Sequence, residues 1–197
     1  MGTSGPQQML ARLESIPLEN EVSEKEGVAF YWFATNHVRR AVGTMSTFYI
    51  WDFFPFYETE GLHDLARHEE SFRAGRPWTF LAYWWLAHSH FLSGYDVDFP
   101  LRVKDSGLEL TARIIRQSRD QYRKRFGSDE FYVLLSRAEF GREIVPYLQR
   151  EKIRYLDFMD LDLETLTHHS VAIAGDGHPT AQAHEAFAKA LADSLSH

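Results

Sequence analysis

The 197 residues suffice for one domain with a sizeable core, and 44% hydrophobic and 25% charged residues are typical of a globular protein. A net charge of −7 and a pI near 5.8 give no electrostatic signature for binding nucleic acid or an anionic membrane, so we expect no nucleic-acid partner. The absence of cysteine excludes disulfides, thiol nucleophiles and cysteine-ligated zinc, whereas ten histidines leave a histidine and carboxylate metal site possible.

The N-terminal part predicts one helix and one strand. Residues 1–20 lack the basic and apolar regions of a signal peptide. Pro6 to Ser15 has apolar residues at helical spacing, with a proline suited to the first turn, which predicts a helix. Val28 to Ala34 (VAFYWFA) is a continuous apolar run of strand length, which predicts a strand buried on both faces, as in a parallel sheet.

The middle of the chain, from about 38 to 100, differs from the rest in being rich in aromatic residues and interrupted by glycine and proline. We interpret it as an insertion of helices and loops. Its most apolar segment, Trp78 to Leu92, is too short and too interrupted by histidines to be a transmembrane segment. It is expected to be a helix that is buried under, or covers, another part of the protein.

The second half of the chain alternates helical and strand patterns. In order, these are an amphipathic helix over Leu108 to Phe126 ending at Gly127, a buried strand over Phe131 to Leu135, a helix over Gly141 to Glu151, a strand over Ile153 to Phe158, and a helix over Pro179 to Leu195 with a buried stripe of Ala183, Phe187, Ala188, Leu191 and Leu195. Alternating elements predict parallel strands with right-handed crossovers. Residues 1–197 are therefore expected to form a single α/β domain with a three-layer architecture, and ligands should bind at the carboxyl ends of the strands.

The segment Asp176-Gly-His178-Pro precedes the last helix and has two interpretations. An aspartate beside a histidine can hold the imidazole tautomer and stabilise the imidazolium, as in a Ser-His-Asp triad. Alternatively, Asp176 caps the helix and His178 is a solvated neighbour.

Three segments together bear a family resemblance. The string GDGHPTAQAHEAFAKAL resembles the fifth sequence block of the SGNH/GDSL hydrolases. YWFATNHVRRAVG is similar to the third block, Gly-x-Asn-Asp, with Ala34, Asn36 and His37 at its glycine, asparagine and aspartate positions. TSGPQQMLARLE is similar to the second block, with Gly5 at its glycine. The resemblance implies a flavodoxin-like α/β/α fold.

The resemblance also implies roles for individual residues. His178 would be the general base that deprotonates a serine, and Asp176 would orient it. The side-chain amide of Asn36 and the backbone N–H of Gly5 would donate to the oxyanion of a tetrahedral intermediate. The implied reaction is hydrolysis of an acyl or acetyl ester of a small molecule, lipid or carbohydrate, with no metal or cofactor.

The sequence departs from the family pattern at several positions. One residue, instead of two, separates Asp176 from His178, and the Gly-Asp-Ser block that carries the nucleophile on the first strand is absent. The predicted elements of this chain therefore lack the N-terminal strands that precede the second block in that family. Three explanations are open: the nucleophile lies upstream of this chain, the chain is a non-catalytic pseudoenzyme or binding module, or Ser4 has taken over as the nucleophile. We favour the first.

The remaining histidines are expected to be structural, and the aromatic insertion has three interpretations. His88 and His90 lack the i, i+4 spacing of paired helical metal ligands, and His63 and His68 with the two glutamates that follow are expected on a solvated helix face. The aromatic insertion can be a satellite core, a lid or acyl-binding wall over the site, or a patch that faces a membrane or partner.

Overall fold

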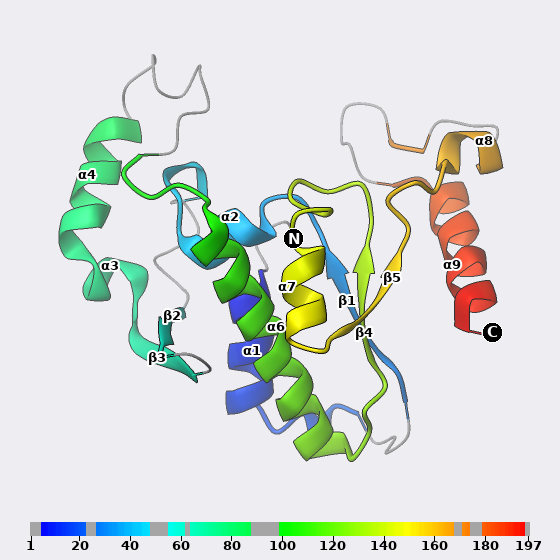
Figure 1. Cartoon of the computed structure of the whole chain (residues 1–197), viewed down its shortest axis with the longest axis horizontal. Helices are drawn as coiled ribbons and strands as arrows, with labels where there is room; N and C mark the ends of the chain where they lie inside the picture. Colours follow the sequence, from blue (N-terminus) through cyan, green and yellow to red (C-terminus); the bar gives the residue numbers. More distant parts are fainter. Residues whose placement is uncertain are drawn as a thin grey trace.

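Three parallel strands form a sheet with helices packed on both faces in the computed structural model of the chain (Figure 1). The structure describes residues 5–22, 27–47, 55–61, 64–87, 99–167, 171–173 and 179–195. The sheet order is β1 (Ala29–Phe33), β4 (Phe131–Leu135) and β5 (Arg154–Asp157), with both pairings parallel. The predicted α/β class with parallel strands is therefore confirmed.

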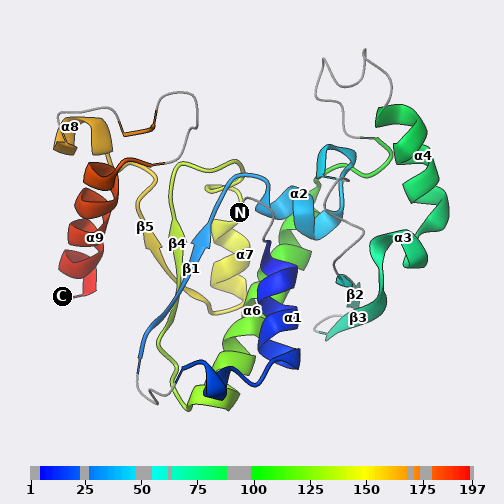
Figure 2. The same ribbon diagram turned by 180° about the vertical axis from the view of Figure 1, so that it is seen from behind.

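The helices are distributed unequally between the two faces of this sheet. α1 (Pro6–Ser15), α6 (Asp105–Phe126) and α7 (Val145–Arg150) lie on one face, and the two views show α1 and α6 side by side (Figures 1 and 2). α9 (Ala181–Leu195) packs on the other face, beside the short helix α8 (Leu163–Thr167). A 3₁₀ turn over Leu18–Asn20 follows α1.

The main core lies between the sheet and α6. Alternate residues of the strands face this helix because side chains of a strand point to opposite sides in turn. The buried side chains at the centre of this core are Tyr31, Phe33, Leu108, Ala112, Ile115, Val133, Leu135 and Leu148. α6 contributes Leu108, Ala112 and Ile115 as one stripe. The helix ends at Gly127, whose φ of 70° is left-handed and favours glycine.

The expectation that the first strand is buried on both faces was wrong. Phe30 and Trp32 are each 39% exposed on the face that α9 covers, while Tyr31 and Phe33 are buried against α6. α9 reaches only part of this second face: the ring of Phe187 lies 4.4 Å from that of Trp32. The reason is that β1 lies at the edge of the sheet, whereas α9 packs mainly over the neighbouring strand β4.

The predicted face of the last helix was also partly wrong. Ala183 and Phe187 are buried as expected, but Ala188 and Leu195 are exposed. Leu191 packs against the cluster as predicted, and so does Ala190, which the prediction did not include.

The middle of the chain contains a β-hairpin that the sequence did not predict. β2 (Pro55–Glu60) and β3 (Asp64–Ser71) pair in antiparallel fashion, and α3 (Phe72–Gly75) and α4 (Pro77–Ala87) follow. The polar sequence of β3, DLARHEES, lacks the β-branched residues typical of strands. His68 therefore lies on a strand and not on a helix, with its ring stacked 4.3 Å from that of Phe56.

A satellite core joins this hairpin to α4. Met45, Phe56, Phe72 and Tyr83 are buried together, and the Tyr83 hydroxyl donates to the carbonyl of Gly43 at 2.9 Å. The interpretation of the aromatic insertion as a satellite core is thus supported for Phe56, whereas Trp84 and Trp85, which were expected to belong to it, are exposed. The other aromatic residues of that prediction lie outside the described residues: Phe48, Tyr49, Trp51, Phe53 and Phe54. In the described ranges, no helix has both the length and the apolar character needed to cross a bilayer.

Replacing Ile115 by alanine should destabilise the protein by about 2–5 kcal/mol, because the side chain is fully buried between α6 and the sheet and its removal leaves a cavity. Urea unfolding followed by circular dichroism measures this change. The control Ile173→Ala removes an exposed side chain and should change stability by at most about 0.5 kcal/mol. Equal effects of the two substitutions would contradict the assigned core.

Candidate functional site

The carboxyl ends of the three strands meet at one end of the sheet, where ligands bind in folds of this kind. The loop after β1 leads there into α2 (His37–Val42), and α1 begins beside α2. Both views also show the start of α9 at this end of the sheet (Figures 1 and 2). We therefore take this end of the sheet as the candidate site.

Asn36 is the first residue of interest at this end. It is the N-cap of α2 and has a left-handed φ of 71°, a conformation that asparagine tolerates better than most residues. Its carbonyl accepts the N–H of Arg40 at 2.8 Å, but its side chain makes no capping hydrogen bond. The amide of Asn36 is thus not used to hold its own helix, as the predicted oxyanion role requires.

Gly5, the second predicted oxyanion residue, is buried at the N-cap of α1. Its N–H donates to the side-chain Oε1 of Gln8 at 2.5 Å, and its carbonyl accepts the N–H groups of Gln8 and Met9. An added Cβ would lie 2.8 Å from Oε1 of Gln7, so a glycine suits the position. In this structure the Gly5 N–H is occupied, and it could serve an oxyanion only if Gln8 moved away.

The structure places Gly5 against Arg40 of α2, the helix that begins after Asn36. The Gln7 side chain donates from Nε2 to the carbonyl of Arg40 at 3.0 Å, and a Cβ at Gly5 would lie 3.3 Å from Cβ of Arg40. Arg40 in turn is one helical turn from Asn36, to which its N–H is bonded. The start of α1 is therefore fixed against α2 close to Asn36.

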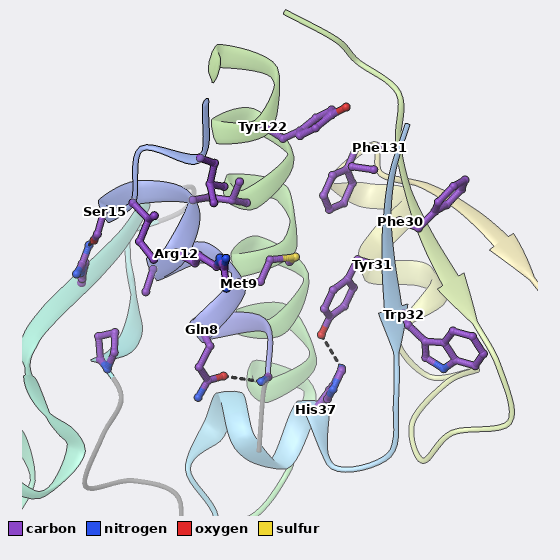
Figure 3. A pocket seen from close by; sticks show the side chains of 18 residues that line it. Gln8, Met9, Arg12, Ser15, Phe30, Tyr31, Trp32, His37, Tyr122 and Phe131 are labelled. Atoms are coloured by element: carbon purple, nitrogen blue, oxygen red, sulfur yellow. Dashed lines mark hydrogen bonds between the residues drawn. The ribbon is translucent and has the colours of Figure 1, made fainter. Parts of the chain in front are cut away.

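His37 has a structural role that sequence reasoning did not identify. Its Nδ1 lies 3.2 Å from the backbone nitrogen of Ala34. It also lies 2.6 Å from the hydroxyl oxygen of Tyr31, a contact that is drawn in Figure 3. A backbone N–H can only donate, so Nδ1 accepts, and the Tyr31 hydroxyl donates to it as well. His37 thus closes the loop after β1 as a neutral ring, and burial raises the pKa of Tyr31 well above its usual value.

A salt bridge joins the loops that follow β1 and β4. Arg39 in α2 donates from Nε and Nη2 to the carboxylate of Glu139, with distances of 2.7 to 3.0 Å. Ser136, the first residue after β4, accepts a hydrogen bond from Nε1 of Trp32 at 3.0 Å. These pairs join residues about one hundred positions apart, so no local sequence signal could have identified them.

Ser4, Asp176 and His178 lie outside the described residues, so their predicted roles stay predictions. Of the residues next to the last two, Pro179 forms an antiparallel bridge with Ala172, and the N–H of Thr180 donates to the carbonyl of Val171 at 2.9 Å. Among the other histidines of the chain, His63, His88, His90, His168 and His169 lie outside the described residues, and His184 is exposed on α9.

A cavity of about 800 Å³ extends along β1 on the side away from β4 (Figure 3). It is lined mainly by apolar side chains of α1, of the segment after it and of β1, among them Met9, Leu13, Ile16 and Tyr31. Among the described residues, no strand pairs with β1 along this side. The cavity therefore lies between α1 and the unpaired edge of β1.

Two buried polar atoms near the start of α1 have no hydrogen-bond partner. They are Oε1 of Gln7 and Nε2 of Gln8, both next to Gly5. An unpaired buried amide atom costs about 1–3 kcal/mol, and native structures contain few of them. These atoms are groups that a further polypeptide segment or a ligand could satisfy.

Comparison with protein families, with curated proteins and with solved structures found no match to this chain. Within the part of the chain that the structure describes, no three histidine or carboxylate side chains converge as a metal site would require.

The pair Arg39 and Glu139 should couple by about 1–2 kcal/mol in a double-mutant cycle of Arg39→Gln and Glu139→Gln, because its hydrogen bonds are charge-assisted and partly shielded from water. Chemical unfolding of the four proteins gives this energy. The exposed pair Arg12 and Glu21 is the control and should couple by about 0.5 kcal/mol. A smaller coupling energy for Arg39 and Glu139 than for Arg12 and Glu21 would show that this salt bridge does not stabilise the site.

Alkaline unfolding should depend on Tyr31. The folded state raises the pKa of this hydroxyl, so its contribution to stability is complete below about pH 10 and is lost as the pH rises further. In Tyr31→Phe, the loss of unfolding free energy above about pH 10 should be less steep, by up to about 1.4 kcal/mol per pH unit. Parallel curves for the two proteins would show that the hydroxyl ionises freely in the folded state.

Proposed function

We propose that this chain is part of a serine-dependent ester hydrolase of the SGNH type. The observation that carries the proposal is that Gly5 lies against Arg40 of α2, at the carboxyl end of a parallel sheet. Arg40 is one helical turn from Asn36. Gly5 and Asn36 come from different segments of the chain, and their positions at this end of the sheet support the proposal of an oxyanion site there.

In the proposed mechanism, a serine hydroxyl attacks the carbonyl carbon of an ester. His178 takes the proton of the hydroxyl and later gives it to the leaving alcohol, and Asp176 orients the imidazole. The Asn36 amide and the Gly5 N–H donate to the oxyanion that forms, after the Gln8 side chain has released the Gly5 N–H. Water then hydrolyses the acyl-enzyme by the same groups. No metal or cofactor takes part.

The geometry beside β1 supports a nucleophile that comes from before Gly5. α1 begins at the carboxyl end of β1 and runs back toward its amino end (Figures 1 and 2). A strand leading into α1 would therefore be parallel to β1 and could pair with its outer edge. The resulting crossover would have the same hand as β1–α6–β4, because α1 and α6 lie on the same face and the sheet continues in the same direction.

Such a strand would end close to Gly5 and α2. It would pack against α1 and occupy the cavity beside β1. A serine at its carboxyl end would lie where the attack is proposed. Within this chain Ser4 is the nearest serine to that position, and a residue further upstream is the alternative that we favour. The substrate class proposed is an acyl or acetyl ester of a small molecule, a lipid or a carbohydrate.

The full polypeptide that contains this chain should react with a fluorophosphonate probe, and mass spectrometry should locate the modified serine before Gly5. Modification of Ser4 would assign the nucleophile to Ser4, and modification further upstream would assign it to the added strand. Absence of labelling in a folded polypeptide that includes the upstream sequence would favour the non-catalytic binding module.

Variants separate the proposed roles. With p-nitrophenyl acetate as substrate, His178→Ala should abolish turnover, and Asn36→Ala should lower kcat by about 10²–10³-fold because one oxyanion donor is lost. His184→Ala is a matched control, since it removes an exposed histidine from α9 and should leave kcat unchanged. Undiminished turnover in a folded His178→Ala variant would refute the mechanism.

A further inference from the structure

The turn that joins β1 to α2 is closed twice between the same two residues. The N–H of His37 donates to the carbonyl of Ala34 at 3.2 Å. In the opposite direction, the N–H of Ala34 donates to Nδ1 of the His37 side chain, also at 3.2 Å. The four residues from Ala34 to His37 therefore form a turn whose two ends are held together by reciprocal hydrogen bonds.

Asn36 has the backbone conformation that this closed turn requires. Its φ of 71° and ψ of −3° are close to those of the third residue of a type II turn, where φ must be positive. This conformation is strained for a residue that carries a Cβ, although less for asparagine than for most others, so it persists only while the surrounding contacts impose it. The side chain of His37 supplies one of these contacts from the position next to Asn36.

Two aromatic residues of β1 hold the imidazole of His37 in place. The ring of Tyr31 stacks on it at a centroid distance of 5.5 Å, and the Tyr31 hydroxyl lies 2.6 Å from Nδ1. The ring of Phe33 meets the imidazole edge to face at a centroid distance of 6.0 Å. Tyr31 and Phe33 are themselves buried in the main core. The side chain that closes the turn is therefore anchored to the sheet.

We propose that His37 is a positioning residue for Asn36, and that protonation of its imidazole opens the turn. An imidazolium carries a proton on both ring nitrogens, so Nδ1 can then no longer accept a hydrogen bond. The Tyr31 hydroxyl can rotate and accept from the new N–H, but the backbone N–H of Ala34 can only donate. Two N–H groups would face each other at the contact that closes the turn, so the ends of the turn would separate.

The surroundings of His37 favour the neutral ring. α6 packs on α2 through apolar residues such as Val38 and Leu108, and α1 brings the neutral side chains of Gln7 and Gln8. The positive charge of Arg40 acts on the Tyr31 hydroxyl beside the ring and disfavours a second positive charge there. The other charged residues of α2, and those of the cavity that His37 lines, are in ion pairs: Arg39 with Glu139, Arg12 with Glu21, and Arg67 with Glu14.

The turn is expected to be closed at neutral pH and to open in mild acid. A histidine that the folded state holds neutral contributes stability above about pH 6.5, the pKa of an unperturbed imidazole, and this contribution is lost as the pH falls further. The consequence for catalysis rests on the proposed function, because an open turn would move Asn36 away from the oxyanion. The opening itself does not require that function and can be measured without a substrate.

Hydrogen exchange of the backbone amides, followed by NMR at about pH 7.5 and about pH 5, tests the proposal. The protection factor of the Ala34 amide should fall by at least about tenfold from the higher to the lower pH, the change expected for the loss of one hydrogen bond. The amide of Val133 in the central strand is the internal reference and should keep its protection, since the opening is local.

The variant His37→Asn separates the hydrogen bond from the charge, because Oδ1 of asparagine can take the place of Nδ1 and does not titrate in this range. In this variant the Ala34 amide should stay protected at both pH values, whereas in His37→Ala it should be unprotected at both. His184→Asn removes an exposed histidine from α9 and is the matched control. It should show the same pH dependence as the unmodified protein.

Either of two results would overturn the proposal. One is equal protection of the Ala34 amide at the two pH values in the unmodified protein. The other is an equal loss of protection in a folded His37→Asn variant, since the group that titrates would then not be His37. Neither result bears on ester hydrolysis, and a lack of turnover with the expected exchange behaviour would refute only the proposed function.

Discussion

The parallel pairing of β1 with β4 on α6 is the interaction on which the remaining structure depends. Its register sets Tyr31 opposite Val133 and Phe33 opposite Leu135, so the large side chains of both strands face the same helix. This packing fixes where β1 ends, and with it the position of Asn36. It also provides the surface of α6 against which α1 packs.

The edge position of β1 explains features that would otherwise be unrelated. It leaves Phe30 and Trp32 partly exposed and borders the apolar cavity beneath α1. Two unpaired amide atoms of Gln7 and Gln8 lie at the same end of α1. One added strand would cover the edge, fill the cavity and reach these amides, so the edge of β1 and the start of α1 both support the proposed position of the nucleophile.

The sequence predicted elements well where apolar periodicity was regular, and poorly where it was not. The helix Pro6–Ser15 and the strand Phe131–Leu135 have the predicted bounds, and α6 begins three residues earlier than expected. The hairpin of β2 and β3 was missed because the polar residues of β3 carry little strand propensity. α7 spans only Val145–Arg150, since turns occupy the start of its predicted range. Of the candidate site, the oxyanion roles of Asn36 and Gly5 stay predictions, and the sequence did not indicate that His37 binds Tyr31.

The sequence by itself determined the α/β class, the parallel strands and the ends of the long helices, because runs of apolar residues, prolines and glycines act on neighbouring backbone positions. Only the tertiary structure decided that β1 is an edge strand, that α1 begins against Arg40, and that Arg39 binds Glu139. These features join segments far apart in the chain. They depend on which surfaces remain to be covered once the sheet and α6 have packed, and no local pattern of residues encodes that outcome.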